Sequence, residues 1–436
     1  MASAVRHAKG TEMRVGWIIA AVVLLPVLAA AGYGSAAQYP LIDKTETPPQ
    51  RATFGEKLIA EGAGLAAIGD CHVCHTAAGG ADYAGNRPIP TPFGVVYSSN
   101  ITPAPGSGIG RWSEAAFRRA MRVGVTRTGR RLFPAFPYPH FAALSDADLR
   151  ALYAFLMTRR PVETTQLPNE LPFPLDQRWL MTFWNLLFFR PAPFRADPRH
   201  GAEWNRGAYL VEGLGHCGDC HTPRNLFGAE EDRRKFAGGE AEGWTAPALD
   251  TAAPAPVRWN AAQLFDYLRR GWDKTHGAAA GPMQPVVAGL AAADPNDVRA
   301  IAAYIAAQEP HSAAIRQASA AASPTPVASN DLGAVLFAGA CAGCHSGREA
   351  MLPPHGIGLA DSTAVNEADA RDAILIVLDG IRQPDNQAGP YMPGFAGSFS
   401  DAQMAALLTY MRGRYAAGPA WPGLAGRVRG LRGRQR

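Results

Sequence analysis

The sequence has few cysteines and lacks the motifs of several large enzyme classes. Only six of its 436 residues are cysteine, and all six lie in three short stretches, so none is left for a structural disulfide elsewhere. It contains no glycine-rich fingerprint for flavin or nicotinamide binding and no nucleophile elbow. The formal net charge of +5 does not indicate a nucleic-acid-binding protein. Because no strand pattern of any length occurs, helices are the expected secondary structure.

The three cysteine-containing stretches share one motif. They read GDCHVCHTA (69–77), GHCGDCHTP (215–223) and GACAGCHSG (339–347). This C-x-x-C-H spacing is typical of c-type haem attachment. Two thiols one helical turn apart can form thioethers to one porphyrin, and the imidazole that follows can bind the iron. The sequence therefore predicts three covalently attached haem c groups, with attachment at Cys71, Cys74, Cys217, Cys220, Cys341 and Cys344 and proximal ligands His75, His221 and His345.

Two other interpretations of the motif explain less. A zinc site needs four Cys or His ligands, so each of the widely separated copies would have to complete its own tetrahedron. A redox-active dithiol needs no trailing His and would not occur three times. His72 and His216, which lie inside or just before the motifs, are expected to be incidental rather than ligands.

The N-terminal region predicts export. Residues 15–42 carry no charge and include GWIIAAVVLLPVLAAAGY, after Arg6, Lys9 and Arg14. This region is either a secretory signal peptide or an uncleaved membrane anchor, and its apolar run of about 18 residues is just long enough to span a bilayer. Because haem c is attached outside the cytoplasm, we expect the body of the protein on the periplasmic side of the bacterial inner membrane, associated with the membrane.

The surroundings of the motifs repeat as well. A short helical pattern precedes each motif, and a loop and a second helix follow it, ending at Gly124, Gly271 or Gly380. A proline-containing loop and a closing helix complete the unit, and Ser145 and Ser400 are the predicted N-caps of two closing helices. The repeat predicts three helical units.

The distance in sequence from the glycine that ends the second helix predicts the sixth ligand of two haem irons. Met283 lies 12 residues after Gly271, and Met392 lies 12 residues after Gly380, each beside a proline. A lone Met is more often a core residue, but two at one offset favour ligands.

The first unit departs from this pattern because the same offset gives Phe136, which cannot bind iron. Three possibilities remain for its haem. His140 in FPYPHF can act as a ligand, Met121 can substitute, or the iron is open and shielded by Phe136. We favour His140, and we expect this haem to have the lowest potential of the three because it lacks a Met ligand.

Each unit resembles the class I cytochrome c domain, and residues 50–415 resemble the tri-haem cytochrome c subunit of membrane-bound periplasmic dehydrogenase complexes. The matching stretches are TPFGVVYSSNITPAPGSGIGRWSEAAFRRAMRVGV, LFPAFPYPHFAALSDADLRALYAFL, YLVEGLGHCGDCHTPRN and YMPGF. The resemblance implies a subunit that is not catalytic alone. It would take electrons from a catalytic subunit, either a molybdenum hydroxylase or a quinoprotein, and pass them to ubiquinone or a terminal oxidase. The PAFPY variant favours a molybdenum-hydroxylase partner.

We therefore predict an all-α protein of three tandem class I cytochrome c domains, preceded by an N-terminal apolar helix. The alternative function is a haem enzyme with peroxidase-like chemistry at an open first haem. The predicted organisation is a signal peptide or anchor with a linker (1–48), domain 1 (49–160), an aromatic-rich connector (161–198), domain 2 (199–309), a flexible linker (310–329), domain 3 (330–416) and a basic C-terminal tail (417–436).

Two segments outside the domains have open roles. LPFPLDQRWLMTFWNLLFFRPAPF (171–194) is either a helix buried between the first two domains or an amphipathic segment at the membrane surface or under a partner subunit. The tail RVRGLRGRQR is either a frayed end or a basic patch that attracts anionic lipid or an acidic partner.

Overall fold

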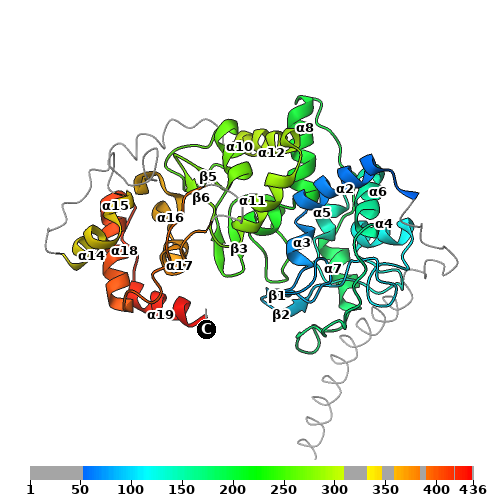
Figure 1. Ribbon diagram of the computed structural model, residues 1–436, viewed down its shortest axis with the longest axis horizontal. Helices are drawn as coiled ribbons and strands as arrows, with labels where there is room; N and C mark the ends of the chain where they lie inside the picture. Colours follow the sequence, from blue (N-terminus) through cyan, green and yellow to red (C-terminus); the bar gives the residue numbers. More distant parts are fainter. Residues whose placement is uncertain (1–52, 309–330, 346–357, 383–388, 417, 435–436) are drawn as a thin grey trace, which may run out of the picture.

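The computed structural model describes residues 53–308, 331–345, 358–382, 389–416 and 418–434. They form three mostly helical units that follow one another along an arc, with the first and third units at its ends (Figure 1). The predicted N-terminal anchor and the predicted linker 310–329 lie outside the described residues. Within the described ranges, no helix is both long enough and apolar enough to cross a membrane.

The first unit begins with the helix that precedes its cysteine motif and ends with a closing helix. Its elements are α2 (Glu56–Ile68), α3 (Cys71–Cys74), β1 (Pro88–Thr91), β2 (Gly94–Tyr97), α4 (Glu114–Val123), α5 (Tyr138–Phe141) and α6 (Asp146–Met157). The hydroxyl of Ser145 accepts a hydrogen bond from the N–H of Asp148, so the predicted N-cap of α6 is confirmed. α4 ends at Gly124, whose positive φ of 64° is typical of a helix C-cap.

The second unit repeats this order, with α7 (Leu180–Phe188) before it in the connector. Its elements are α8 (Ala202–Tyr209), the π-helical segment η2 (Leu210–Leu214), α9 (Gly218–His221), the 3-10 turn η3 (Asp232–Arg234), β3 (Gly239–Ala241), β4 (Trp244–Ala246), α10 (Ala261–Arg270), β5 (Trp272–Asp273), β6 (Gly277–Ala278), α11 (Met283–Ala292) and α12 (Pro295–Gln308).

The third unit is shorter and carries an additional C-terminal helix. Its elements are α14 (Leu332–Ala340), α15 (Ala342–His345), the 3-10 turn η4 (Leu359–Asp361), α16 (Thr363–Asn366), α17 (Arg371–Asp379), α18 (Asp401–Tyr415) and α19 (Leu424–Arg434). Ser400 caps α18 in a capping box with Gln403, so this predicted N-cap is also confirmed.

Three small hairpins depart from the expectation of a purely helical chain. β1 pairs with β2, β3 with β4 and β5 with β6, each as an isolated antiparallel pair. The longest of these strands has four residues. A strand this short has too few residues to show the alternation of apolar and polar residues by which strands are recognised in a sequence.

The same close helix crossing occurs in all three units. The first helix of each unit packs against the closing helix: α2 on α6, α8 on α12 and α14 on α18. The contact is made by Gly62, Gly207 and Gly333. A Cβ on these glycines would lie 2.0, 2.0 and 2.3 Å from the carbonyl oxygens of Ala151, Ala300 and Ala406 respectively. Only glycine permits this approach, so the three units share one backbone arrangement.

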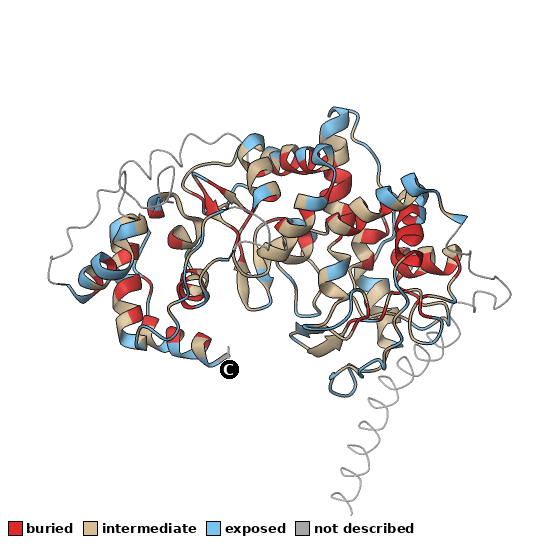
Figure 2. Ribbon diagram, in the orientation of Figure 1, coloured by how far each residue is buried: buried red, intermediate tan, exposed pale blue. Residues whose placement is uncertain are grey.

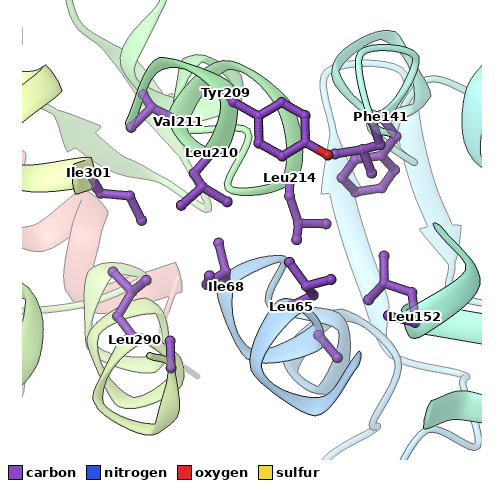
Figure 3. Close-up of a cluster of buried hydrophobic side chains, with 14 of the residues drawn as sticks. Leu65, Ile68, Phe141, Leu152, Tyr209, Leu210, Val211, Leu214, Leu290 and Ile301 are labelled. Carbon is purple, nitrogen blue, oxygen red and sulfur yellow. The ribbon is translucent and has the colours of Figure 1, made fainter. Parts of the chain in front are cut away.

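The first two units share a continuous core, whereas the third has its own. One cluster of buried apolar side chains runs from Leu65 and Ile68 on α2 to Leu210 and Leu214 of the second unit (Figure 3). A second cluster lies among α14, α17, α18 and α19. Figure 2 shows the buried residues concentrated where the helices of each unit cross.

The C-terminal tail is a packed helix rather than a frayed end. Trp421, Leu424, Val428 and Leu431 are buried against the third unit. Arg432 pairs with Asp401 at 3.0 Å and donates to the backbone. This corrects the alternative of a frayed tail, because apolar residues at helical spacing bury one face of α19.

The connector helix α7 has one packed and one exposed face. Trp184 contacts Tyr138 of the first unit and donates from its indole N–H to the carbonyl of Phe227 in the second, 3.0 Å away. On the other face, Leu186 and Leu187 are 68% and 64% exposed. The helix therefore joins the first two units without being buried between them.

Candidate haem-binding sites

Each cysteine motif lies at a one-turn helix that follows the first helix of its unit. These turns are α3, α9 and α15, and each includes the second cysteine of its motif. The first cysteine begins α3 and directly precedes α9 and α15. The six thiols form no disulfide with one another. Burial raises the pKa of Cys71, Cys217 and Cys220 to about 12, so these thiols are neutral and lie in apolar surroundings.

The predicted proximal histidines of the first two motifs are oriented by backbone carbonyls. Nδ1 of His75 donates to the carbonyl of Ser99 at 2.6 Å, and Nδ1 of His221 donates to that of Pro247 at 2.7 Å. Burial lowers the pKa of both histidines, which favours the neutral ring. A neutral ring protonated on Nδ1 leaves the Nε2 lone pair free to bind a metal.

The second and third sites open into one continuous, predominantly apolar cavity. Its lining includes Cys217, Cys220, His221 and Met283 of the second unit and Cys341, Cys344, His345 and Met392 of the third. Met283 is the first residue of α11, and the backbone of Met392 pairs with that of Ile381. Each proximal His and its predicted Met ligand thus line the same space, and the donor set and the apolar walls fit haem c.

The first site lacks this pairing. Phe136 lies partly buried against the core, with its ring 5.4 Å from that of Phe141. Met121 is buried in the hydrophobic cluster on α4. His140, the ligand that we favoured from the sequence, faces the second unit instead.

Both ring nitrogens of His140 have protein partners. Nε2 donates to Oε1 of Glu230 at 2.6 Å, with Oδ1 of Asp219 at 3.6 Å, and Nδ1 donates to the carbonyl of Glu212 at 2.7 Å. Burial opposes the charged form, but hydrogen bonds to Asp219 and Glu230 outweigh it and raise the pKa of His140 well above its usual value. Both ring nitrogens of His140 are therefore engaged by groups of the second unit.

The motifs of the first two units lie close together. A Cβ on Gly69 would lie 2.8 Å from Cδ1 of Leu214, just before the second motif. Burial raises the pKa of Cys74 to about 11, and the charge of Asp219 from the second motif contributes to this increase. The first site therefore adjoins the second, and the second shares its cavity with the third.

Sequence reasoning missed several residues that build these sites. Ser99 and Pro247 act through backbone carbonyls, which leave no signature in a sequence. Asp219 and Glu230 meet His140 only because two units pack together. Trp244 lines the shared cavity, and nothing in its local sequence distinguishes it from an ordinary strand residue.

The comparisons with known proteins agree with this geometry. The cytochrome c family matches residues 59–160 and 331–414, which lie in the first and third units. The chain is 47% identical over 392 residues to one of the subunits of the nicotinate dehydrogenase of Pseudomonas putida. That alignment covers 88% of this chain and 33% of the relative, so the chain spans about a third of that protein's length.

Two other relatives match along most of their length. The gluconate 2-dehydrogenase cytochrome c subunit of Pantoea cypripedii is 35% identical over 396 residues, which cover 83% of this chain and 87% of the relative. The cytochrome c subunit of the quinone-dependent alcohol dehydrogenase of Gluconobacter oxydans is 34% identical over 425 residues, which cover 92% of this chain and 84% of the relative.

Proposed function

The chain belongs to the family of cytochrome c subunits of dehydrogenase complexes, and we propose that it is a tri-haem member that links a periplasmic catalytic subunit to ubiquinone or a terminal oxidase. Within its family it is an electron-transfer subunit rather than a catalytic one. The observation that carries the proposed haem count is the threefold recurrence of the glycine-mediated helix crossing, each with a C-x-x-C-H motif on the turn that follows.

Each unit would attach its haem in the same way, but the units differ in the sixth ligand. Bound haem c contributes an iron that accepts and releases one electron. The paired thiols fix the group covalently, and the carbonyls of Ser99 and Pro247 hold His75 and His221 in the tautomer that exposes Nε2. We assign Met283 and Met392 as the sixth ligands of the second and third sites, and we propose that the first site has no sixth protein ligand.

The catalytic partner that we propose is a molybdenum-containing hydroxylase. The support is the PAFPY variant of the sequence, whose resemblance favours such a partner. The higher identity to the nicotinate dehydrogenase relative, 47%, than to the gluconate and alcohol dehydrogenase relatives, 35% and 34%, sets the chain apart from the latter two. The test is purification of the tagged chain from detergent-solubilised membranes, with identification of bound proteins by mass spectrometry. A large molybdenum-cofactor subunit is expected, and a quinoprotein or flavoprotein subunit in its place would overturn the assignment.

We also propose that the protein associates with the membrane through two regions. The first is the uncharged N-terminal run 15–42. The second is the exposed apolar surface of Leu186 and Leu187 on α7 with Leu226 and Phe227 on the neighbouring loop. A variant that lacks residues 1–37 behind a cleavable leader separates their contributions. Recovery of the wild-type protein in the soluble periplasm would contradict membrane association.

The haem count is tested by intact-mass spectrometry. The chain is produced together with a haem c maturation system, and three haem increments are expected. A Cys220→Ala variant should lose one thioether and destabilise the second unit, while the first and third haems stay attached. Two or fewer increments on fully matured wild-type protein would refute the tri-haem assignment.

A further inference from the structure

The β3–β4 hairpin of the second unit contacts all three units. Its two-residue turn, Glu242 and Gly243, has positive φ at both positions, as a tight hairpin requires. Glu242 pairs with Arg87 of the first unit at 2.5 Å. On the same hairpin, Glu240 pairs with Arg371 of the third unit at 2.8 Å. The hairpin is therefore fixed from both sides at the junction of the units.

The hairpin is also part of the second haem site. A Cβ on Gly239 would lie 2.3 Å from the carbonyl oxygen of Cys220. β4 leads directly to Pro247, whose carbonyl orients His221. A displacement of the hairpin would thus displace the second site.

Trp244, the first residue of β4, lies between the second and third sites. A Cβ on Gly281 would lie 2.4 Å from Cε2 of Trp244, so the indole rests on the loop that leads to Met283. The indole also packs against the hydrophobic cluster of the third unit. It lines the shared cavity together with Met283 and Met392.

Two further contacts hold the third unit on this side of the second. The N–H of Thr245, next to Trp244, donates to Oδ1 of Asp372 on α17 at 2.8 Å. Gln284, next to Met283, donates to the carbonyl of Arg382 at 2.7 Å. These contacts flank the indole, so the two units meet around Trp244.

We propose that Trp244 is a positioning residue for electron transfer, because its indole fills the wall between the second and third sites and fixes their separation. This inference rests on the proposed tri-haem function. The transfer moves one electron from one unit to the next, so that one is oxidised as the other is reduced, and no covalent bond forms or breaks. A rigid, partly buried aromatic side chain suits the role because it adds contact area with little conformational freedom to lose.

The test compares three variants of the full-length holoprotein with the wild type. Trp244→Ala removes the indole, and Trp244→Phe keeps an aromatic ring. Trp421→Ala removes a buried tryptophan of the third unit, whose indole N–H donates to the carbonyl of Glu367. The measurements are the coupled Soret circular dichroism of neighbouring haems, which reports their relative orientation, and the rate of electron equilibration after photoreduction.

The expected result is loss of the coupled Soret signal and slower equilibration in Trp244→Ala, and near-wild-type behaviour in Trp244→Phe. Trp421→Ala should lower the stability of the third unit and leave the Soret coupling intact. Suppose that Trp244→Ala carries three haem increments and keeps the wild-type Soret coupling and electron-equilibration rate. This result would overturn the role of Trp244 and leave the proposed tri-haem function standing. Fewer than three increments on the wild type would overturn the proposed function and this inference with it.

Discussion

His140 carries a positive charge at the joint between the first two units. Its pKa is raised above the usual value of about 6.5, because its hydrogen bonds to Asp219 and Glu230 outweigh the effect of burial. Because the pKa of His140 is higher in the folded state than in the unfolded state, protonation of His140 stabilises the folded state. This stabilisation is complete below the unfolded-state pKa of about 6.5, and it is lost as the pH rises through the folded-state pKa. We therefore expect the unfolding free energy of the joined units to fall with rising pH above neutrality.

The measurement is urea unfolding of the holoprotein between pH 6 and 9. A His140→Gln variant should lose about 2 kcal/mol at pH 6 and show a weaker pH slope, because it keeps the size of the side chain but not its charge. His72→Gln is the control, since His72 is exposed and pairs only at the surface with Asp82. An equal pH slope in wild type and His140→Gln would mean that His140 does not supply the pH dependence.

Phe136 is the residue that we propose leaves the first iron accessible. It lies at the sequence offset that gives Met in the other two units, while His140 pairs with Glu230 and Met121 is buried on α4. We expect the wild-type protein to bind one carbon monoxide per chain. Phe136→Met should prevent this binding and raise the lowest of the three midpoint potentials, because a thioether ligand favours ferrous iron.

The control for this prediction is Phe141→Met, which changes the neighbouring ring without placing sulfur at the expected offset. Carbon monoxide titration and redox titration are the measurements. Suppose that Phe136→Met changes neither the binding of carbon monoxide nor any midpoint potential. The 12-residue offset would then not identify sixth ligands, and the assignment of Met283 and Met392 would fail as well.

Among the secondary-structure elements, α2 offers a matched pair of glycines. A Cβ on Gly62 would lie 2.0 Å from the carbonyl oxygen of Ala151, whereas one on Gly64 would meet nothing within 4 Å. Gly62→Ala should therefore destabilise the first unit by about 3 kcal/mol, because α2 and α6 must separate. Gly64→Ala should raise stability by about 0.5–1 kcal/mol, because alanine favours the helical backbone.

Thermal unfolding of the two holoprotein variants checks this prediction. Both variants replace glycine by alanine, two residues apart in the same helix. Helix propensity alone therefore predicts that both substitutions raise stability. Stabilisation by Gly62→Ala would show that the helices do not cross as closely as the structure has them.

The elements differ in how far the sequence reveals them. Ser145 and Ser400 are recognisable as N-caps because capping depends on local residues. The hairpins escape prediction because strands of two to four residues carry no period. The contacts of His140 with the second unit escape prediction because its main partner, Glu230, lies 90 residues later in the sequence, across a unit boundary. Features that depend on neighbouring residues, such as N-caps, can be predicted from the sequence, whereas contacts between units cannot.

For the whole molecule, the distribution of the core predicts how the protein unfolds. The first two units share one hydrophobic cluster, and the third has a separate cluster. Units that share a core lose their packing together, whereas a separate core can unfold independently. We therefore expect two calorimetric transitions in the holoprotein, a larger one for the first and second units and a smaller one for the third.

Two leucine substitutions assign these transitions. Leu214 is fully buried where the second unit meets the first, and Leu408 is fully buried in the third. Leu214→Ala should destabilise the larger transition by about 3 kcal/mol and leave the smaller in place, and Leu408→Ala should do the reverse. Three transitions, with Leu214→Ala shifting only one of the first two, would mean that the shared core does not couple these units. The structure favours coupling, because Leu214 packs directly on Gly69, at the end of the helix that leads to the first motif.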